Sequence, residues 1–204
     1  MDGGSVLPAV PPTRNGSRTT MARPILLVGS APLPTTRDAL ATVAETIGNL
    51  VERIPDGEVS KVRLGWIQCQ RDTLVKATGL EIEGQRTVPG YKYNAYRIAS
   101  NSNASDVRFG SLGYADWARD SYAEFRRLKQ AGNIAQPTRF QVCLPAPFDV
   151  CSAFIVPSDM KAVWLACEHA MAAELEKIAQ AILAEELAVQ WDMVHEFIYV
   201  MEKP

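Results

Sequence analysis

The chain has 204 residues, of which 47% are hydrophobic and 22% charged, and its formal net charge is −2. This composition is typical of a globular protein with one domain or a small pair of domains, and it excludes a largely disordered chain. The near-neutral charge, with scattered Lys and Arg, gives no electrostatic case for binding nucleic acid or an anionic membrane.

The first half of the chain alternates strand-like and helix-like segments. Residues 1–23 are rich in Gly, Pro, Ser, Thr and Arg, which predicts a disordered tail. The short apolar run 25–28 is typical of a buried parallel strand, and apolar residues at helical spacing predict a helix over 36–47. A second strand is predicted over about 51–54, followed by a helix over about 60–76. This order favours β/α units with a parallel sheet.

Residues 79–110 interrupt that alternation. Charged residues alternate over 81–86, tyrosines alternate with polar residues over 91–96, and a polar run rich in Ser and Asn occupies 99–105. We predict a β-hairpin or irregular excursion followed by a mobile loop. Such a loop at the rim of a sheet can serve as a lid, and it can equally be a surface insertion with no role.

The β/α pattern then resumes. An amphipathic helix is predicted over about 113–131, and the apolar run 139–144 predicts a third strand. A long helix capped by Ser158 or Asp159 should continue to about 183, followed by a fourth strand over 187–191. We therefore expect an α/β fold in which four parallel strands alternate with helices.

The ends of these predicted strands carry the residues that we expect to bind a ligand. In parallel β/α units all strand carboxyl ends lie on one rim, which brings together Ser30, Glu58 and Asp192. Glu58 and Asp192 could pair with an ammonium group, while Ser30 and nearby backbone N–H groups could receive a carboxylate. The two acids could instead perform general acid/base work if one pKa were raised.

Simpler explanations exist for the same residues. Asp56 lies in a Pro-Asp-Gly turn, and we interpret it as a turn residue only. Ser30 could be a turn hydroxyl, and Asp192 could cap a final helix. His169 and His195 are expected to pack or to lie on the surface. No P-loop, dinucleotide-binding, nucleophile-elbow or zinc-ligand spacing is present in the sequence.

The cellular setting follows from the cysteines and the apolar runs. No apolar run approaches the roughly 20 residues of a membrane helix, and the first residues lack the apolar core of a secretory signal. The cysteines form no C-x-x-C pair and are predicted to be buried free thiols, which suits a reducing compartment. We expect a cytoplasmic protein. The four are Cys69, Cys143, Cys151 and Cys167.

Three short segments resemble a known enzyme family. Residues 28–32, 56–58 with Arg63, and 189–192 are similar, in order, to the first, second and fourth strand ends of the catalytic barrel of cobalamin-independent methionine synthase. Over about 24–197 the chain resembles uncharacterised proteins of the uroporphyrinogen decarboxylase/methionine synthase-like barrel superfamily. The resemblance implies a partial TIM-type barrel, comprising about the first four of eight β/α units.

The resemblance also implies roles for single residues. Ser30, Glu58 and Asp192 match the residues that hold the amino-acid substrate homocysteine in the synthase, and Arg63 could orient Glu58. The zinc ligands of the family lie on later strands, beyond the end of this sequence. We therefore expect no zinc or other cofactor within this chain, and no methionine synthesis by this polypeptide alone.

These expectations lead to two functional hypotheses. The first is a methionine-synthase-like protein that keeps an amino-acid or small-carboxylate binding rim, with a methyltransferase-like or lyase-like activity in a specialised biosynthetic pathway. The second is a non-catalytic truncated barrel that serves as a subunit, regulatory fragment or remnant. Because half a barrel exposes strand edges, we expect a homo-oligomer or a partner chain that completes it. Decarboxylation of a porphyrinogen is disfavoured, since it would need several arginines at the rim.

Overall fold

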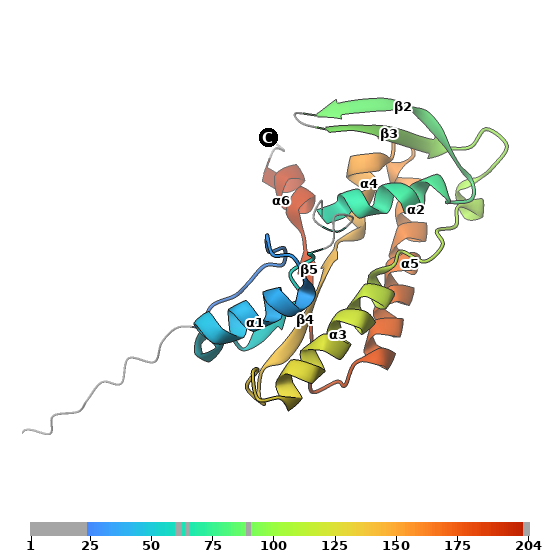
Figure 1. The fold of residues 1–204 in the computed structure, drawn as a ribbon. Coiled ribbons are helices and arrows are strands. Elements are labelled where there is room, and N and C mark those ends of the chain that lie inside the picture. The colour runs from blue at the N-terminus through green and yellow to red at the C-terminus, as the bar shows by residue number, and fades with distance from the viewer. Residues whose placement is uncertain (1–23, 60–62, 64–65, 89–90, 202–204) are drawn as a thin grey trace, which may run out of the picture.

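A computed structural model describes residues 24–59, 63, 66–88 and 91–201 of the chain (Figure 1). Helices and strands alternate along much of the chain, and a separate β-hairpin interrupts this alternation. The predicted tail over 1–23 lies outside the described residues. In chain order the elements are α1 (Thr36–Ile47), η1 (Gly48–Leu50), β1 (Arg53–Pro55), η2 (Trp66–Gln70), α2 (Arg71–Val75), β2 (Leu80–Val88), β3 (Tyr91–Ile98), η3 (Ala104–Asp106), α3 (Tyr114–Gln130), β4 (Arg139–Pro145), α4 (Pro147–Phe154), α5 (Met160–Ala181), β5 (Leu187–Asp192) and α6 (Val194–Met201).

The central sheet is parallel, as predicted, and has the strand order β1-β4-β5. Ile54 lies opposite Phe140 in the first pair, and Leu144 lies opposite Trp191 in the second. Parallel pairing places the carboxyl ends of all three strands on the same rim. Among the described residues these strands do not close into a barrel. The α/β class is therefore confirmed at the level of an open parallel sheet with helices.

The first predicted strand, over 25–28, is wrong. The Ile25 N–H donates to the Leu50 carbonyl at 2.7 Å, but the segment forms no strand. The Leu27 carbonyl accepts from the Gln141 side-chain amide at 2.8 Å, and the Val28 carbonyl accepts from the Gln190 amide at 2.6 Å. The segment is apolar enough for a strand. However, glutamine side chains of the sheet donate to the carbonyls that would otherwise accept backbone hydrogen bonds from a neighbouring strand.

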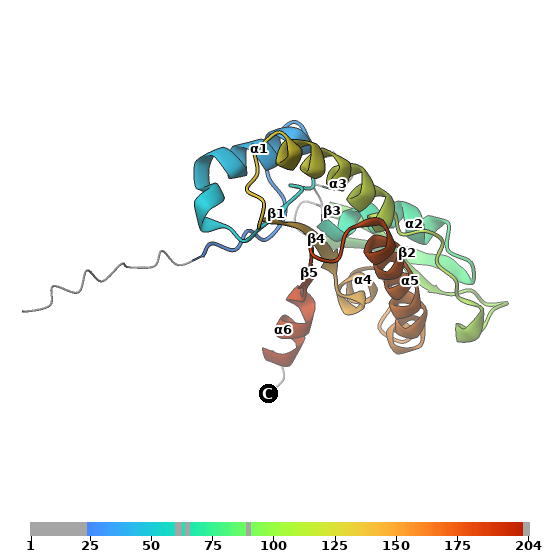
Figure 2. The same cartoon turned by 90° about the horizontal axis from the view of Figure 1, so that it is seen from below.

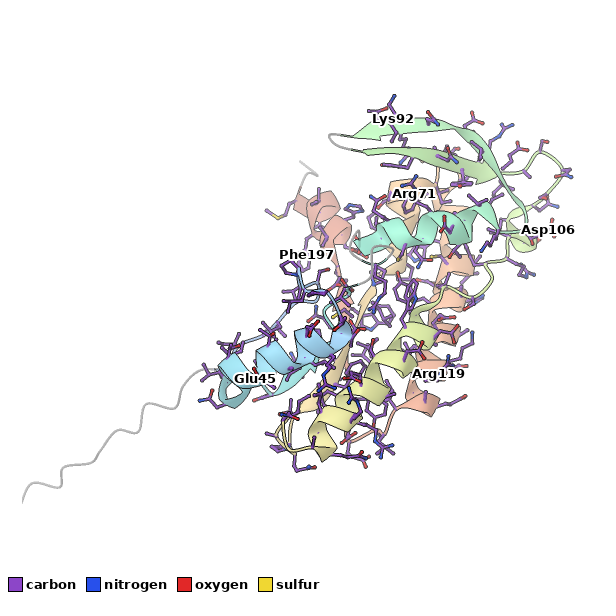
Figure 3. All side chains as sticks on the ribbon, in the orientation of Figure 1. Glu45, Arg71, Lys92, Asp106, Arg119 and Phe197 are labelled. Carbon is purple, nitrogen blue, oxygen red and sulfur yellow. The ribbon has the colours of Figure 1, made fainter. Side chains whose placement is uncertain are left out.

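One face of the sheet packs against α1, α3 and α5 (Figures 1 and 2). Side chains alternate along a strand, so Ile54, Phe140 and Leu144 share this face and are almost fully buried. Phe125 of α3 packs on Phe140 with ring centroids 5.5 Å apart. Burial of each such side chain contributes about 1.5–3 kcal/mol. The helices keep charged residues on the outside, such as Glu45 and Arg119 in Figure 3.

The opposite face of the sheet is polar. Alternation places Arg53, Gln141, Cys143 and Gln190 on this face, where they meet the segment that precedes α1. Arg53 Nε donates to Gln141 Oε1 at 3.0 Å, and the Cys143 thiol donates to the Val28 carbonyl at 3.1 Å. The segment that leads to Ser30 is thereby fixed by the sheet.

The hairpin predicted within 79–110 is confirmed as the antiparallel pair β2–β3. It is anchored on α4 and α5. The Arg86 guanidinium donates to three carbonyls at the end of α4, among them that of Ile155 at 2.9 Å. The Asp159 carboxylate, at the start of α5, accepts from the Ile98 N–H at 2.8 Å. Asp159 is the N-cap residue of α5, as predicted, but its side chain makes no capping hydrogen bond and holds the hairpin.

Two helical predictions need correction. The helix predicted over 60–76 is, within the described residues, a 3-10 turn (η2) followed by the short helix α2, while residues 60–62 and 64–65 lie outside the described part. Helix α4 was not predicted, because Pro145 and Pro147 were interpreted as the end of a strand. Proline at the first turn of a helix is well tolerated, and α4 begins at Pro147. No helix among the described residues is long and apolar enough to cross a membrane.

Candidate functional site

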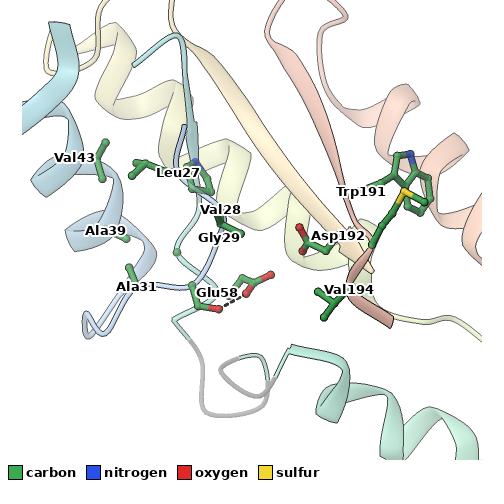
Figure 4. Close-up of a pocket in the computed structure, with 14 residues that line it drawn as sticks. Leu27, Val28, Gly29, Ala31, Ala39, Val43, Glu58, Trp191, Asp192 and Val194 are labelled. Carbon is green, nitrogen blue, oxygen red and sulfur yellow. Dashed lines mark hydrogen bonds between the residues drawn. The ribbon is translucent and has the colours of Figure 1, made fainter. Parts of the chain in front are cut away.

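A pocket of about 600 Å³ opens at the carboxyl ends of β1 and β5 (Figure 4). Its walls come from the segment before α1, from α1 itself, from the turn after β1, and from the junction of β5 and α6. The pocket has a mainly apolar lining with two carboxylates and one hydroxyl. The lining residues are Leu27, Val28, Gly29, Ser30, Ala31, Ala39, Val43, Pro55, Gly57, Glu58, Trp191, Asp192, Met193 and Val194.

The turn after β1 presents Glu58 to this pocket. Gly57 has φ 81°, and a Cβ at this position would lie 2.6 Å from the Cβ of Ala39, so only glycine fits. The Ala31 N–H donates to the Gly57 carbonyl at 2.7 Å. Glu58 itself has φ 49°, a left-handed conformation that is uncommon for a residue with a side chain. The turn therefore fixes the direction of the Glu58 side chain.

Ser30 and Glu58 are in direct contact. The Ser30 hydroxyl donates to Glu58 Oε2 at 2.5 Å. Burial raises the pKa of Glu58 above its ordinary value. The Ser30 bond and the Arg63 charge lower this pKa, and the charges of Asp56 and Asp192 raise it again, with a net rise. The predicted meeting of Ser30 with Glu58 on one rim is thus realised in the fold.

Asp192 lies at the end of β5 and lines the same pocket. Its Oδ1 accepts from the Gln190 amide at 2.7 Å, and its backbone carbonyl accepts from the Ala146 N–H at 2.9 Å. In Figure 4 the carboxylates of Asp192 and Glu58 lie on facing sides of the cavity. The two acids share one cavity, and the charge of Asp192 raises the pKa of Glu58.

Arg63 is placed beside this site and not among its lining residues. Its two terminal nitrogens donate to the two oxygens of Asp56, at 2.6 and 3.0 Å. Its guanidinium also lies over the Trp117 ring, 5.3 Å from the centroid. Arg63 was predicted to orient Glu58. It donates to Asp56, which in turn binds the Glu58 N–H, and its positive charge lowers the pKa of Glu58.

The interpretation of Asp56 as a turn residue only is wrong. Asp56 does accept from the Glu58 N–H at 3.0 Å, as a turn residue would. It is also only 5% exposed, and it accepts from the Ser121 hydroxyl of α3 at 2.7 Å in addition to Arg63. A buried carboxylate with four donor contacts is a structural centre of the site. No local pattern indicated these contacts, because Ser121 lies 65 residues further along the chain.

Sequence reasoning also missed the two glutamines behind the pocket. Gln141 donates to Gln190 Oε1 at 3.0 Å, and Gln190 in turn donates to both Val28 and Asp192. This network links the Asp192 carboxylate with the segment that carries Ser30. A polar residue at alternate positions of an otherwise apolar strand was the available signal.

A second acidic cluster lies outside the pocket, between α4 and α6. Asp149 is fully buried, and its Oδ1 accepts from the backbone N–H of His195 at 2.7 Å. The Ser152 hydroxyl and the His195 Nδ1 are 2.7 Å apart. Burial raises the pKa of Glu196, and the neighbouring Asp149 carboxyl raises it further. His195 was expected to pack or to lie on the surface, and it packs.

The chemistry of the pocket favours a cation. Two carboxylates and a hydroxyl line it, and no Lys, Arg or His is among the described lining residues. Within residues 24–59, 63, 66–88 and 91–201, no group of three or more His, Cys, Asp or Glu side chains is arranged to hold a metal ion. All four cysteines are buried free thiols, as predicted. Burial raises the pKa of the Cys143 thiol to about 12.

Comparison of the chain with protein-family models, with curated proteins and with solved structures finds no match in any of the three.

Proposed function

We propose that the pocket binds a small amine-bearing molecule of the amino-acid type, with Glu58 and Asp192 receiving the ammonium group. The observation that supports this most directly is that two carboxylates share one cavity whose described lining contains no basic side chain. An ammonium has three N–H donors, and charge-assisted bonds to carboxylates are stronger than neutral ones. A bound cation would also relieve the repulsion between the two acids.

The rest of the pocket suits the remainder of such a ligand. Apolar side chains, including Val43, Trp191 and Val194, offer a surface for an aliphatic or thioether chain. The Ser30 hydroxyl and the backbone around it could receive a carboxylate. The resemblance to cobalamin-independent methionine synthase supports the same choice, because the matching residues of that family hold homocysteine. We therefore propose a methionine-synthase-like origin for this rim.

The raised pKa of Glu58 adds a possible chemical role. A carboxyl whose pKa is raised by burial can exchange protons with a bound ligand more readily near neutral pH than an ordinary glutamate. The methyltransferase-like or lyase-like activity that we expect would use Glu58 in this way. Binding is the part of the proposal that can be tested first, since it needs no knowledge of the reaction.

Isothermal titration calorimetry with four related ligands tests the site. Homocysteine and methionine carry both groups, 3-(methylthio)propylamine carries only the amine, and 4-(methylthio)butanoate carries only the carboxylate. We expect the first three to bind and the last to fail. Glu58→Gln or Asp192→Asn should each weaken binding about 10- to 100-fold, the loss of one charged hydrogen bond.

Glu45→Gln, an exposed acid on α1, serves as the matched control and should bind like the unchanged protein. Equal binding of the amine and the deaminated analogue would contradict the proposal, as would affinities that do not change in the Glu58 and Asp192 variants.

A second candidate function, an association subunit, is favoured by one surface. The outer strand β5 contains no Lys, Arg or Pro, residues that commonly protect a strand edge. Helix α6 projects beside it (Figure 2), and Figure 3 labels its Phe197. Phe197 is 66% exposed and Met201 82% exposed, with Trp191 of β5 at 40%. Exposed apolar surface of this kind marks an interface.

We propose a second copy of this chain as the occupant of that surface, because a two-fold contact requires one such surface repeated. Sedimentation velocity at micromolar concentration should show a dimer. Phe197→Lys should shift the protein to a monomer. Ile82→Lys serves as the control, because Ile82 is also apolar and is 56% exposed on the hairpin, and it should leave the dimer intact. A stable monomer of the unchanged chain would exclude this candidate.

A further inference from the structure

We propose that Asp56 is a positioning residue for Glu58: it holds the backbone of Glu58 in a left-handed turn and fixes the positive charge of Arg63 beside it. For ligand binding the inference rests on the proposed function, while its structural part stands on the contacts alone. Asp56 is not among the residues that line the pocket, and it would act through Glu58, whose N–H it binds.

The first step concerns the backbone. Glu58 is the only non-glycine residue with positive φ among the described residues. The left-handed conformation costs a residue with a side chain about 1–2 kcal/mol. The Glu58 N–H donates to Asp56 Oδ1 at 3.0 Å, a bond within the turn that offsets part of this cost. With this backbone conformation the Glu58 side chain reaches Gly29, the neighbour of Ser30. A Cβ added at Gly29 would lie 3.5 Å from Glu58 Oε2.

The second step concerns the anchoring of Asp56. Its carboxylate is held by Arg63 from the loop and by the Ser121 hydroxyl from α3. The side chains of Arg63 and Asp56 are 14% and 8% exposed, so the ion pair is mostly excluded from water. Because Arg63 and Ser121 hold the Asp56 carboxylate from two directions, the acceptor of the Glu58 N–H has a fixed position. The turn is therefore held by α3 and by Arg63 as well as by its own internal hydrogen bond.

The third step concerns charge. Arg63 lowers the pKa of Glu58 and Asp56 raises it, while burial, the largest contribution, also raises it. Because the ion pair is close to neutral as a unit, loss of one partner leaves the other charge uncompensated near Glu58. Removal of the Asp56 charge and removal of the Arg63 charge should thus move the Glu58 pKa in opposite directions.

Titration of the Glu58 carboxyl by ¹³C NMR in the ligand-free full chain tests this. We expect Asp56→Asn to lower the Glu58 pKa and Arg63→Met to raise it. Ser121→Ala, which removes a neutral donor to Asp56, should move it less than either charge variant. A purely structural role predicts a shift in the same direction for both charge variants, toward the pKa of an unconstrained glutamate, and that outcome would overturn the inference.

Two further variants keep the test decisive if Asp56→Asn does not fold. Arg63→Lys retains the charge without the paired bonds and should leave the Glu58 pKa close to that of the unchanged protein, whereas Arg63→Gln should raise it. Equal shifts in these two would overturn the role of the charge. The titration needs no ligand, so a failure of amine binding and a failure of this inference are separately visible.

Discussion

Two buried aspartates at the same rim of the sheet have different partners. Asp56 follows β1 and accepts from two nitrogens of Arg63, from the Ser121 hydroxyl and from a backbone N–H. Asp149 follows β4, in the first turn of α4, and its Oδ1 accepts from the His195 N–H. Its Oδ2 is buried and has no hydrogen-bond donor among the described residues. The first acid is paired with the Arg63 guanidinium, whereas the second lies near another acid, Glu196, with the His195 Nδ1 3.5 Å from the Asp149 Oδ1.

The surroundings of Asp149 include a second carboxyl group. Glu196 Oε2 is likewise buried without a donor among the described residues. Burial raises the pKa of Glu196 and the neighbouring Asp149 carboxyl raises it further, while the charge of His195 lowers it. The stability of this cluster should therefore depend on pH through Glu196.

The largest effect should follow from Asp56→Ala. This change leaves the mostly buried Arg63 guanidinium without its carboxylate, and removing one partner of a buried pair costs about 3–5 kcal/mol. Urea unfolding followed by circular dichroism measures the loss. A loss below about 1 kcal/mol, the range of an exposed pair, would show that water replaces the carboxylate.

A smaller effect is expected at Asp149. Asp149→Ala removes the acceptor of the His195 N–H and should destabilise the fold by about 1–3 kcal/mol. Asp149→Asn should lose less than Asp149→Ala, since its amide can both accept from His195 and donate to Glu196. At Asp56 the corresponding amide should give little rescue, because it cannot neutralise Arg63. The same urea series compares all four variants, and an equal rescue at both sites would remove the distinction.

The pH dependence of stability should report on the Glu196 carboxyl of the Asp149 cluster. The folded pKa of Glu196 is raised, so its contribution to stability is fully present below the unfolded pKa, about 4.3, and is lost as the pH rises through the folded value. Glu196→Gln should remove this part of the pH profile. Unfolding free energies of the unchanged protein and of Glu196→Gln, measured at several pH values above 4, test this. Glu45→Gln, which changes an exposed acid, is the control and should keep the pH profile of the unchanged protein. Parallel profiles of the unchanged protein and Glu196→Gln would contradict the raised pKa of Glu196.

The smallest effects should come from the two hydroxyls. Ser121→Ala removes a donor to Asp56, and Ser152→Ala removes the contact with His195. Each should cost about 0.5–1.5 kcal/mol, the usual net contribution of one hydrogen bond. Thermal unfolding measures both. The Ser121 variant should lose more, since its partner is charged and buried, and the reverse order would weaken the distinction between the two acids.

Much of the fold could be predicted where a segment packs by its own periodicity. The apolar spacing in 113–131 and 158–183 predicted α3 and α5, and the apolar run at 139–144 predicted β4. The hairpin was visible from alternation. The run at 25–28 has equal apolar character and forms no strand, because its carbonyls are bound by glutamine side chains from the sheet.

The candidate site divides in the same way. From the sequence alone, Glu58 and Asp192 could be placed at one rim, because parallel strands align their carboxyl ends. Ser30 lies at that rim although 25–28 forms no strand, because side chains of the sheet bind the carbonyls that precede it. The sharp turn could also be predicted, from Pro55 and Gly57. The partners of Asp56 and Asp149 could not be predicted, since Ser121 and His195 lie 65 and 46 residues away along the chain. Local chemistry fixes where a carboxylate lies along the chain, whereas its hydrogen-bond and charge partners depend on how distant segments pack.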